Sequence, residues 1–217
     1  ARSEMCIRDR CYGRYEIHKV RSNIMTIYLV RHGESKSNYD NKHFRSYFCG
    51  QLDVPLTDTG TKSADDLCDY FKEKQIKHVY VSDLLRTQQT FEHIFPYDIA
   101  STTTPLLRER SLGVFEGEYK DEISANPKYE KYFNDPNFKD FRHSFSQKAP
   151  EGESYEDVYQ RVEHFMNHVV NEDTQKDDIV IVAHQVVIRC LMVYFNKVSR
   201  AEAVDLKVEN CKPYIIE

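Results

Sequence analysis

Short apolar runs rich in β-branched residues alternate along this chain with segments whose apolar residues recur at helical spacing. Candidate strands lie at 26–30, 79–81, 99–104 and 179–183, and candidate helices at 57–74, 82–95, 154–169 and 188–195. Strands that alternate with helices build a sheet covered by helices on both faces. The pattern therefore predicts an α/β fold, a three-layer α/β/α sandwich around a mostly parallel, doubly wound sheet. Two later runs, 204–208 and 214–217, are expected to be further strands.

Three hydroxyl residues stand where expected helices begin. Thr57, Ser82 and Ser154 are each placed to accept a hydrogen bond from the first turn of the helix that follows. Asp157 lies three residues after Ser154, which is the spacing of a capping box. We therefore expect these three residues to cap their helices.

The first 24 residues differ from the rest of the chain. They hold six basic and three acidic side chains and contain no apolar run of the signal-peptide kind. We expect 1–24 to be a non-native or disordered leader that precedes a natural start at Met25, and 25–217 to form a single domain. Within that domain, 116–149 is rich in Tyr, Phe, Asn, Asp and Lys. We expect it to form short helices and loops, an insert that acts as a partial lid over one end of the sheet.

Charge and cysteine usage exclude several classes of protein. The net charge is −5, and no basic stripe is present, whereas a duplex-binding protein needs one. No stretch approaches the ~18 apolar residues of a membrane span. Six scattered cysteines without a C-x-x-C pair favour reduced thiols and a cytoplasmic location. We therefore expect no nucleic-acid or membrane partner. Oligomeric state and the completeness of the C-terminus at Glu217 are not constrained by the sequence.

Polar residues follow the expected strands at four places. They are Arg31-His32-Gly33-Glu34, Asp83 to Arg86, Glu109-Arg110 and His184-Gln185. In open α/β sheets the carboxyl ends of the strands meet at one edge, and ligands bind there. We therefore expect two histidines, at least two arginines and a carboxylate to converge.

This set of side chains suits phosphoryl transfer. Arginine forks bind a phosphomonoester dianion bidentately, and a neutral imidazole can attack phosphorus to form a phosphohistidine. A carboxylic acid can protonate the leaving oxygen and afterwards activate water. The rival is a zinc site made of His32, His184 and Glu109. Two arginines beside such a site would repel a cation, so we expect no metal and no cofactor.

Five blocks of the sequence resemble the signature blocks of the histidine phosphatase, or phosphoglycerate mutase-like, superfamily. They are 29–35 (Leu-Val-Arg-His-Gly-Glu-Ser) with Asn38, then 50–60, 82–90, 107–117 and 182–184. The resemblance implies that His32 is the phosphorylated nucleophile and that Glu109 is the proton donor. It also implies that Arg31, Arg86 and His184, assisted by Asn38, hold the phosphoryl group. It leaves Glu34 to orient the pocket or cap its loop, and the amide of Gln185 to reach the phosphate.

Residues 149–162 and 182–191 resemble the bisphosphatase half of the bifunctional enzymes that act on fructose 2,6-bisphosphate. That branch holds its second phosphate with basic and tyrosine residues of the insert, which makes Tyr119, Arg142 and Lys148, together with Gln51, candidates for substrate binding. The resemblance implies a metal-independent phosphomonoesterase whose partner is a small phosphorylated metabolite such as a sugar phosphate. Two alternatives stay open: a 2,3-bisphosphoglycerate-dependent phosphoglycerate mutase, and a non-catalytic module that binds a phosphorylated ligand.

Overall fold

The computed structural model describes residues 25–123, 125–135, 138, 141–170 and 177–217, so the expected leader 1–24 lies outside the described residues. The strands are β1 (Ile27–Arg31), β2 (Ile76–Ser82), β3 (Ser101–Thr104), β4 (Asp178–Ala183) and β5 (Pro213–Ile216). The helices are α1 (Lys36–His43), α2 (Asp58–Lys72), α3 (Leu85–Ile94), α4 (Lys120–Ile123), α5 (Glu130–Phe133), α6 (Tyr155–His168), α7 (Gln185–Tyr194) and α8 (Arg200–Ala203). Two 3₁₀ turns are η1 (Pro105–Leu107) and η2 (Gly113–Phe115).

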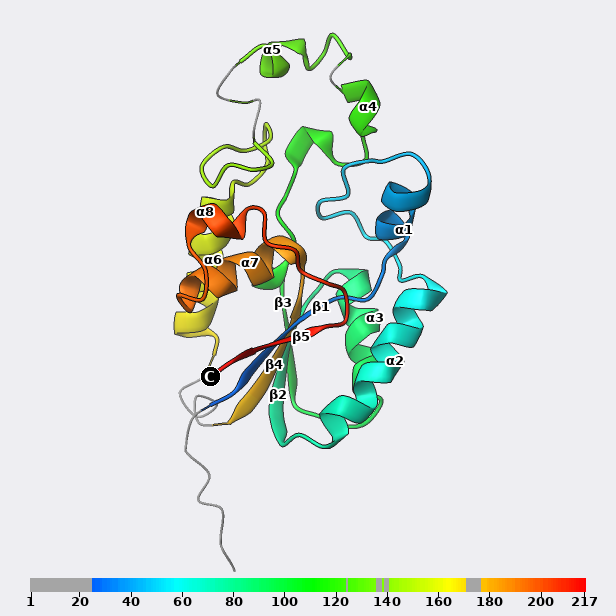
Figure 1. Ribbon diagram of the computed structural model, residues 1–217, viewed down its shortest axis with the longest axis vertical. Coiled ribbons are helices and arrows are strands. Elements are labelled where there is room, and N and C mark those ends of the chain that lie inside the picture. Colours follow the sequence, from blue (N-terminus) through cyan, green and yellow to red (C-terminus); the bar gives the residue numbers. More distant parts are fainter. Residues whose placement is uncertain (1–24, 124, 136–137, 139–140, 171–176) are drawn as a thin grey trace, which may run out of the picture.

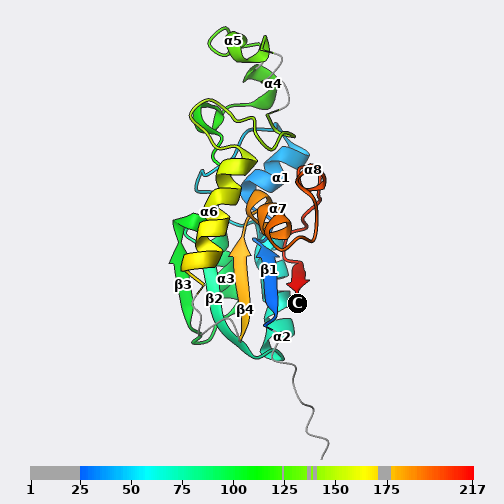
Figure 2. The same ribbon diagram turned by 90° about the vertical axis from the view of Figure 1, so that its left-hand side faces the viewer.

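One sheet organises these elements. Its strand order is β3-β2-β4-β1-β5, and β5 is antiparallel to β1 while the other pairs are parallel. Helices α6 and α7 cover one face and α2 and α3 the other (Figures 1 and 2). The predicted three-layer, mostly parallel α/β/α fold is therefore confirmed.

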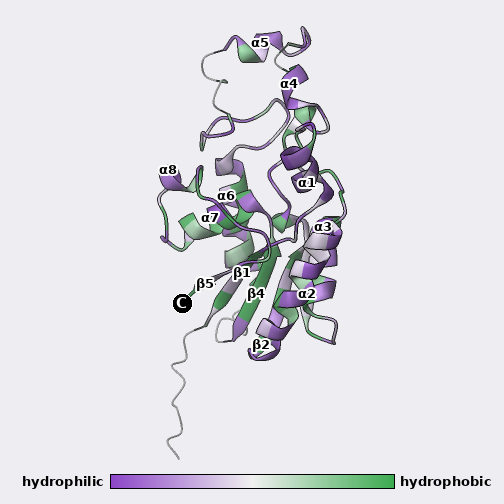
Figure 3. Ribbon diagram, turned by 45° about the vertical axis from the view of Figure 1, so that its right-hand side comes forward, coloured by the Kyte–Doolittle hydropathy of each residue, from purple (hydrophilic) through white to green (hydrophobic). Residues whose placement is uncertain are grey.

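The two faces of the sheet bury different residues of the same strands. In β1, Ile27 and Leu29 pack with the residues of α6 and α7, whereas Tyr28 and Val30 pack with α2 and α3. This alternation follows from the period of two in a strand. Strand β4 is apolar toward both faces and is coloured as hydrophobic between the helices in Figure 3. A strand buried on both faces is expected at the centre of a parallel sheet.

The expected caps hold at Thr57 and Ser154 but not at Ser82. Thr57 accepts from the Gly60 N–H, and Ser154 forms a capping box with Asp157. Ser82 is instead the last residue of β2, and helix α3 begins only at Leu85. The N–H of Leu85 donates to the Asp53 carboxylate, 2.8 Å away. A residue distant in sequence thus supplies the cap that Ser82 was expected to make.

The expected strand at 204–208 is also wrong. This segment follows α8 as turn and irregular chain. Two of its backbone carbonyls are used by arginines, because Arg189 Nε donates to Leu206 O at 2.8 Å and Arg31 Nη1 donates to Val208 O at 2.7 Å. The two valines of this segment, Val204 and Val208, are therefore buried without being in a strand. The backbone carbonyls accept hydrogen bonds from arginine side chains and not from a neighbouring strand.

The segment 116–149 contains α4 and α5, as the expectation of short helices and loops requires. Its Ile123, Tyr129 and Phe141 pack with Phe48 and Phe115, which precede the segment, in a separate hydrophobic cluster. Figure 1 places α4 and α5 beyond the carboxyl ends of the strands. Among the described helices, none is long and apolar enough to cross a membrane.

A close backbone contact between the loop after β1 and the start of α2 yields a stability prediction. The Cβ of an alanine at position 60 would overlap the backbone of Glu34. Gly60→Ala should therefore destabilise the protein by about 1–3 kcal/mol, although alanine favours helices by itself. Urea denaturation measures this difference. Thr59→Ala, at the exposed neighbouring position, is the control and should change the unfolding free energy little. A stabilised Gly60→Ala protein would contradict the assigned contact.

Candidate active site

A cavity of about 400 Å³ opens at the carboxyl ends of the strands. Residues from separate elements line it, and the predicted ones among them are Arg31, His32, Asn38, Arg86, Glu109, Arg142 and Gln185. His184 lies next to this lining, with its ring centroid 5.2 Å from that of His32. The structure thus brings together every residue that was predicted to bind or transfer the phosphoryl group.

His32 extends the sheet by one residue, because its N–H donates to Ala183 O at 3.1 Å. Its Nδ1 lies 2.7 Å from Gly33 O. A carbonyl only accepts, so Nδ1 carries the proton and Nε2 of the neutral ring keeps a free lone pair. Burial holds the pKa of His32 well below its usual value, and the charges of Arg86 and Arg31 lower it further. The ring is therefore a neutral imidazole of fixed tautomer, as a nitrogen nucleophile requires.

His184 is fully buried and is held by Ser82, whose Oγ lies 2.9 Å from His184 Nε2. Its Nδ1 has no hydrogen-bond partner among the described residues. Burial again lowers the pKa well below its usual value, and the Arg86 charge is the second cause. A buried ring nitrogen without a partner is costly unless a ligand atom binds it.

Arg86 and Arg31 carry permanent charge into this buried region. Arg86 is 2% exposed and donates to Leu52 O at 2.8 Å and to Gly50 O at 3.0 Å. Arg31 donates through Nη1 to Val208 O, while its buried Nε has no partner in the described part of the chain. Because neutral carbonyls hold both guanidinium groups, their charge stays available to an anion.

Glu109 lies at the N-terminus of α7. Its Oε1 accepts from the N–H of Val186 at 3.2 Å and from its neighbour Arg110 at 2.8 Å. The carboxyl group is therefore beside the start of the helix that follows His184, at the edge of the cavity.

Asn38 is placed by the first turn of α1. Its Oδ1 accepts from the Ser35 N–H at 3.1 Å, which completes a capping box. Asn210 donates to the backbone oxygen of His32 at 2.6 Å and reaches Asn38 Oδ1 at 3.4 Å. Glu34 accepts from the Thr57 hydroxyl at 2.8 Å, so it ties its own loop to α2, the loop-capping role allowed by the sequence.

Three predicted substrate-binding residues do not line the cavity in the described structure. The side-chain amide of Gln51 donates to Glu109 O at 2.9 Å, so Gln51 holds the backbone of Glu109 and does not line the cavity. Tyr119 is exposed and lies under the Arg45 guanidinium, 4.1 Å from ring centroid to Cζ. Lys148 pairs with Asp157 at 3.3 Å on the outside of α6. Their side chains are used by other partners, and only Arg142 of the four candidates lies at the cavity.

Four other lining residues were not predicted to bind substrate, although Arg110 was expected near the site: Arg110, Lys120, Tyr155 and Arg189. Arg189 had a visible signal, because it is the single charged residue in the apolar run of α7. Arg110 follows Glu109 directly, and its guanidinium stacks on the Tyr155 ring at 4.7 Å. Lys120 is the neighbour of Tyr119, which was the residue predicted to bind substrate. The prediction was therefore one residue away from the side chain that lines the cavity.

The arrangement of possible donor side chains bears on whether the protein could hold a metal ion. In the ranges that the structure describes, no group of three or more His, Cys, Asp and Glu side chains is arranged to hold a metal ion. The cavity instead carries Arg31, Arg86 and Arg110, which repel a cation. That the protein needs no metal stays a prediction.

Residues 27–217 match the sequence model of the histidine phosphatase superfamily (branch 1). The chain belongs to this superfamily. Among curated relatives, the 6-phosphofructo-2-kinase/fructose-2,6-bisphosphatase of Caenorhabditis elegans is 32% identical to this chain in an alignment of 201 residues that covers 83% of this chain and 39% of the relative. The human 6-phosphofructo-2-kinase/fructose-2,6-bisphosphatase 4 is 32% identical in an alignment of 186 residues that covers 83% of this chain and 35% of the relative. The chain thus spans less than two fifths of either relative.

Solved structures agree with the fold of this histidine phosphatase. Bacillus stearothermophilus YhfR superposes with a TM-score of 0.74 at 28% identity, over 89% of this chain and 91% of that chain. The alpha-ribazole phosphatase of Shigella flexneri gives a TM-score of 0.75 at 23% identity, over 89% and 90%, which is a likeness of fold. The predicted superfamily and fold are confirmed. Membership also supports the predicted class of enzyme, a phosphatase.

The geometry predicts the protonation state of His32 in the free protein. At about pH 6.5 a free imidazole is half protonated, whereas His32 should be neutral with its proton on Nδ1, because its pKa is lowered. Nitrogen-15 NMR of the histidine side chains distinguishes the two states. Arg86→Gln should raise the pKa of His32, since it removes a charge that lowers it. A charged imidazolium at this pH in the unmodified protein would contradict the assignment.

Proposed function

We propose that this chain is a metal-independent phosphatase that hydrolyses a small phosphomonoester through a phosphohistidine at His32. One observation carries the proposal: the free Nε2 of a neutral His32 shares a buried site with two arginines and with the unpartnered Nδ1 of His184. The superfamily and the phosphatase and bisphosphatase names of its relatives support it.

In the first step the phosphoryl group binds among Arg31, Arg86 and His184. His32 Nε2 attacks phosphorus, and the bond from phosphorus to the ester oxygen breaks. The electron pair of that bond leaves with the oxygen, and the carboxylic acid of Glu109 supplies its proton. The arginines and His184 Nδ1 stabilise the charge on the three equatorial oxygens.

In the second step a water molecule attacks the phosphohistidine. The Glu109 carboxylate takes a proton from this water, the bond between nitrogen and phosphorus breaks, and its electron pair returns to His32 Nε2. Inorganic phosphate leaves, and Glu109 is again a carboxylic acid. Permanent arginine charge performs the role that a metal ion has in other phosphatases. The site therefore returns to its starting state without a cofactor.

The substrate class that we propose is a sugar bisphosphate. Apart from Arg31 and Arg86, the cavity is lined by a basic wall, which we define as Arg110, Lys120, Arg142 and Arg189. The carboxylates in the lining are Glu109 and Asp205, and Asp205 is paired with His143 at 3.0 Å. Four cations beyond the reacting group suit a second phosphate. The cavity volume suits a small metabolite.

The location and the insert belong to the same proposal. Cys49, Cys68, Cys190 and Cys211 are free thiols, which fits a reducing cytoplasm. We propose that 25–217 acts as one domain and that 116–149 acts as a partial lid. Lys120 and Arg142 of this insert line the cavity, which supports that role.

The nucleophile is tested by His32→Ala. Release of inorganic phosphate from a sugar bisphosphate, measured with EDTA present, should fall at least about a thousandfold, while the circular dichroism spectrum is unchanged. His164→Ala, at an exposed position of α6, is the matched control and should keep full activity. Activity that survives in His32→Ala, or that requires a divalent metal, would refute the mechanism. With 3-phosphoglycerate as the substrate, isomerisation without phosphate release would establish the mutase alternative.

The second phosphate is tested through Lys120. Burial, with Arg142 nearby, lowers the pKa of Lys120 to about 8. Above this pH the amine loses its positive charge, so KM for a sugar bisphosphate should rise about tenfold between about pH 7 and 9. Lys120→Arg keeps its charge and should remove the rise, whereas Lys120→Met should show the high KM throughout. A sugar monophosphate serves as the control substrate. Equal KM values for the two variants, or a pH-dependent rise that persists in both, would reject this contact.

A further inference from the structure

The chain that carries Glu109 has no regular secondary structure to hold it. Between η1 and η2, residues 108–112 belong to no helix or strand. Catalytic groups must be held within a fraction of an ångström of their working position. The backbone of Glu109 therefore depends on side chains from elsewhere.

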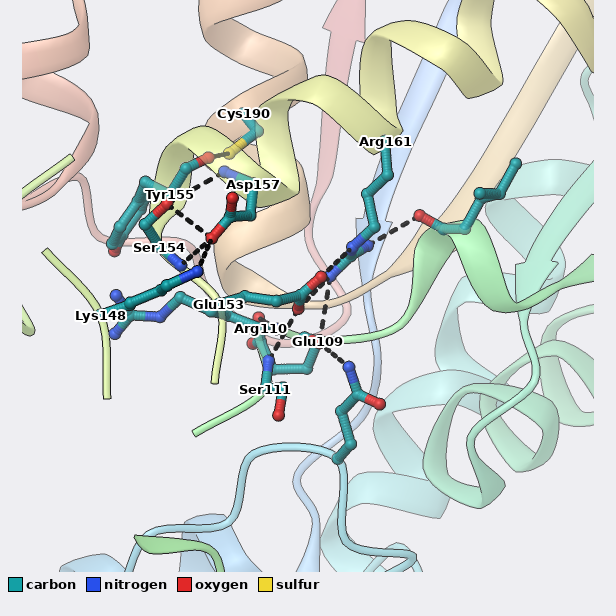
Figure 4. Close-up of polar contacts among 12 residues, drawn as sticks. Glu109, Arg110, Ser111, Lys148, Glu153, Ser154, Tyr155, Asp157, Arg161 and Cys190 are labelled. Carbon is teal, nitrogen blue, oxygen red and sulfur yellow. Dashed lines mark hydrogen bonds and ion pairs between the residues drawn. The ribbon is translucent and has the colours of Figure 1, made fainter. Parts of the chain in front are cut away.

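An ion pair at the start of α6 supplies this support. Arg161 Nε donates to Glu153 Oε1 at 2.8 Å and Nη2 donates to Oε2 at 3.1 Å, which is a bidentate pair. The two side chains are only 15% and 24% exposed. Figure 4 shows the Arg161 guanidinium between the Glu153 carboxylate and the backbone of Glu109.

Both members of the pair also bind the irregular segment. Arg161 donates to Leu106 O at 2.7 Å and to Glu109 O at 3.1 Å. Glu153 Oε2 accepts from the N–H of Ser111 at 2.8 Å. The segment is thus fixed on both sides of Glu109, and Gln51 adds a second donor to Glu109 O.

We infer that the Arg161–Glu153 pair positions the carboxyl group of Glu109 for proton transfer to the leaving oxygen. The inference rests on the proposed function, in which Glu109 is the proton donor. Only an arginine has enough donors in a fixed plane to bind a carboxylate and two carbonyls together. Because the pair touches the backbone and not the cavity, Arg161 and Glu153 are positioning residues.

The test is Arg161→Lys. Lysine keeps the positive charge, which helps to lower the pKa of His184, but it cannot make the same set of hydrogen bonds. The readout is kcat/KM for an alkyl phosphate and for p-nitrophenyl phosphate, whose leaving group departs without a proton. We expect a loss of about 30- to 100-fold for the alkyl ester and less than about threefold for the aryl ester.

Two further variants complete the design. Arg200→Lys disrupts the exposed pair of Arg200 with Glu156, also on α6, and should leave both esters unaffected. Glu153→Gln keeps the side-chain shape and should show the same preference as Arg161→Lys, so it decides the question if Arg161→Lys fails to fold. Equal losses on both esters, or no loss on either, would overturn the inference. Unmodified protein that hydrolyses neither ester, or active His32→Ala, would instead reject the proposed function.

Discussion

The parallel pairing of β1 with β4 is the constraint on which the rest of the site depends. Arg31 lies opposite Ala183, so the two strands end side by side and His32 and His184 follow directly. The bond from His32 N–H to Ala183 O extends this register by one residue. A slip of one residue would move every side chain of the strand to the opposite face and would separate the two imidazoles. The strand register that builds the two cores therefore also sets the spacing of His32 and His184.

The positive charge of the cavity depends on which groups its arginines bind. Arginines that line the cavity, such as Arg31, Arg86 and Arg189, donate to backbone carbonyls. Arginines at the surface, such as Arg45 and Arg200, pair with carboxylates. A carbonyl satisfies hydrogen-bond donors without cancelling their charge. The net charge of the whole chain is −5, yet the arginines give the cavity a local positive potential. This potential can compensate a bound dianion for the hydration that it loses.

The sequence predicts the sheet, the covering helices and the groups around His32, because each depends on local periodicity or on the end of a strand. It fails where partners are distant. Ser82 reads as a helix cap, but His184 engages it across the sheet. The segment 204–208 reads as a strand, but its carbonyls serve Arg31 and Arg189. In the insert 116–149 no helical or strand periodicity shows which residues face the cavity. The sequence therefore indicated Tyr119, whereas its neighbour Lys120 lines the cavity.

The two ends of the cavity therefore rest on different physical foundations. The end that holds His32 and His184 is part of the sheet, and changing it would disturb the core. The end formed by Lys120 and Arg142 rests on an aromatic cluster separate from the two cores that flank the sheet. Substitutions there would alter the charge and shape of this end of the cavity without moving His32. The chemistry and the substrate preference of this fold can thus vary independently.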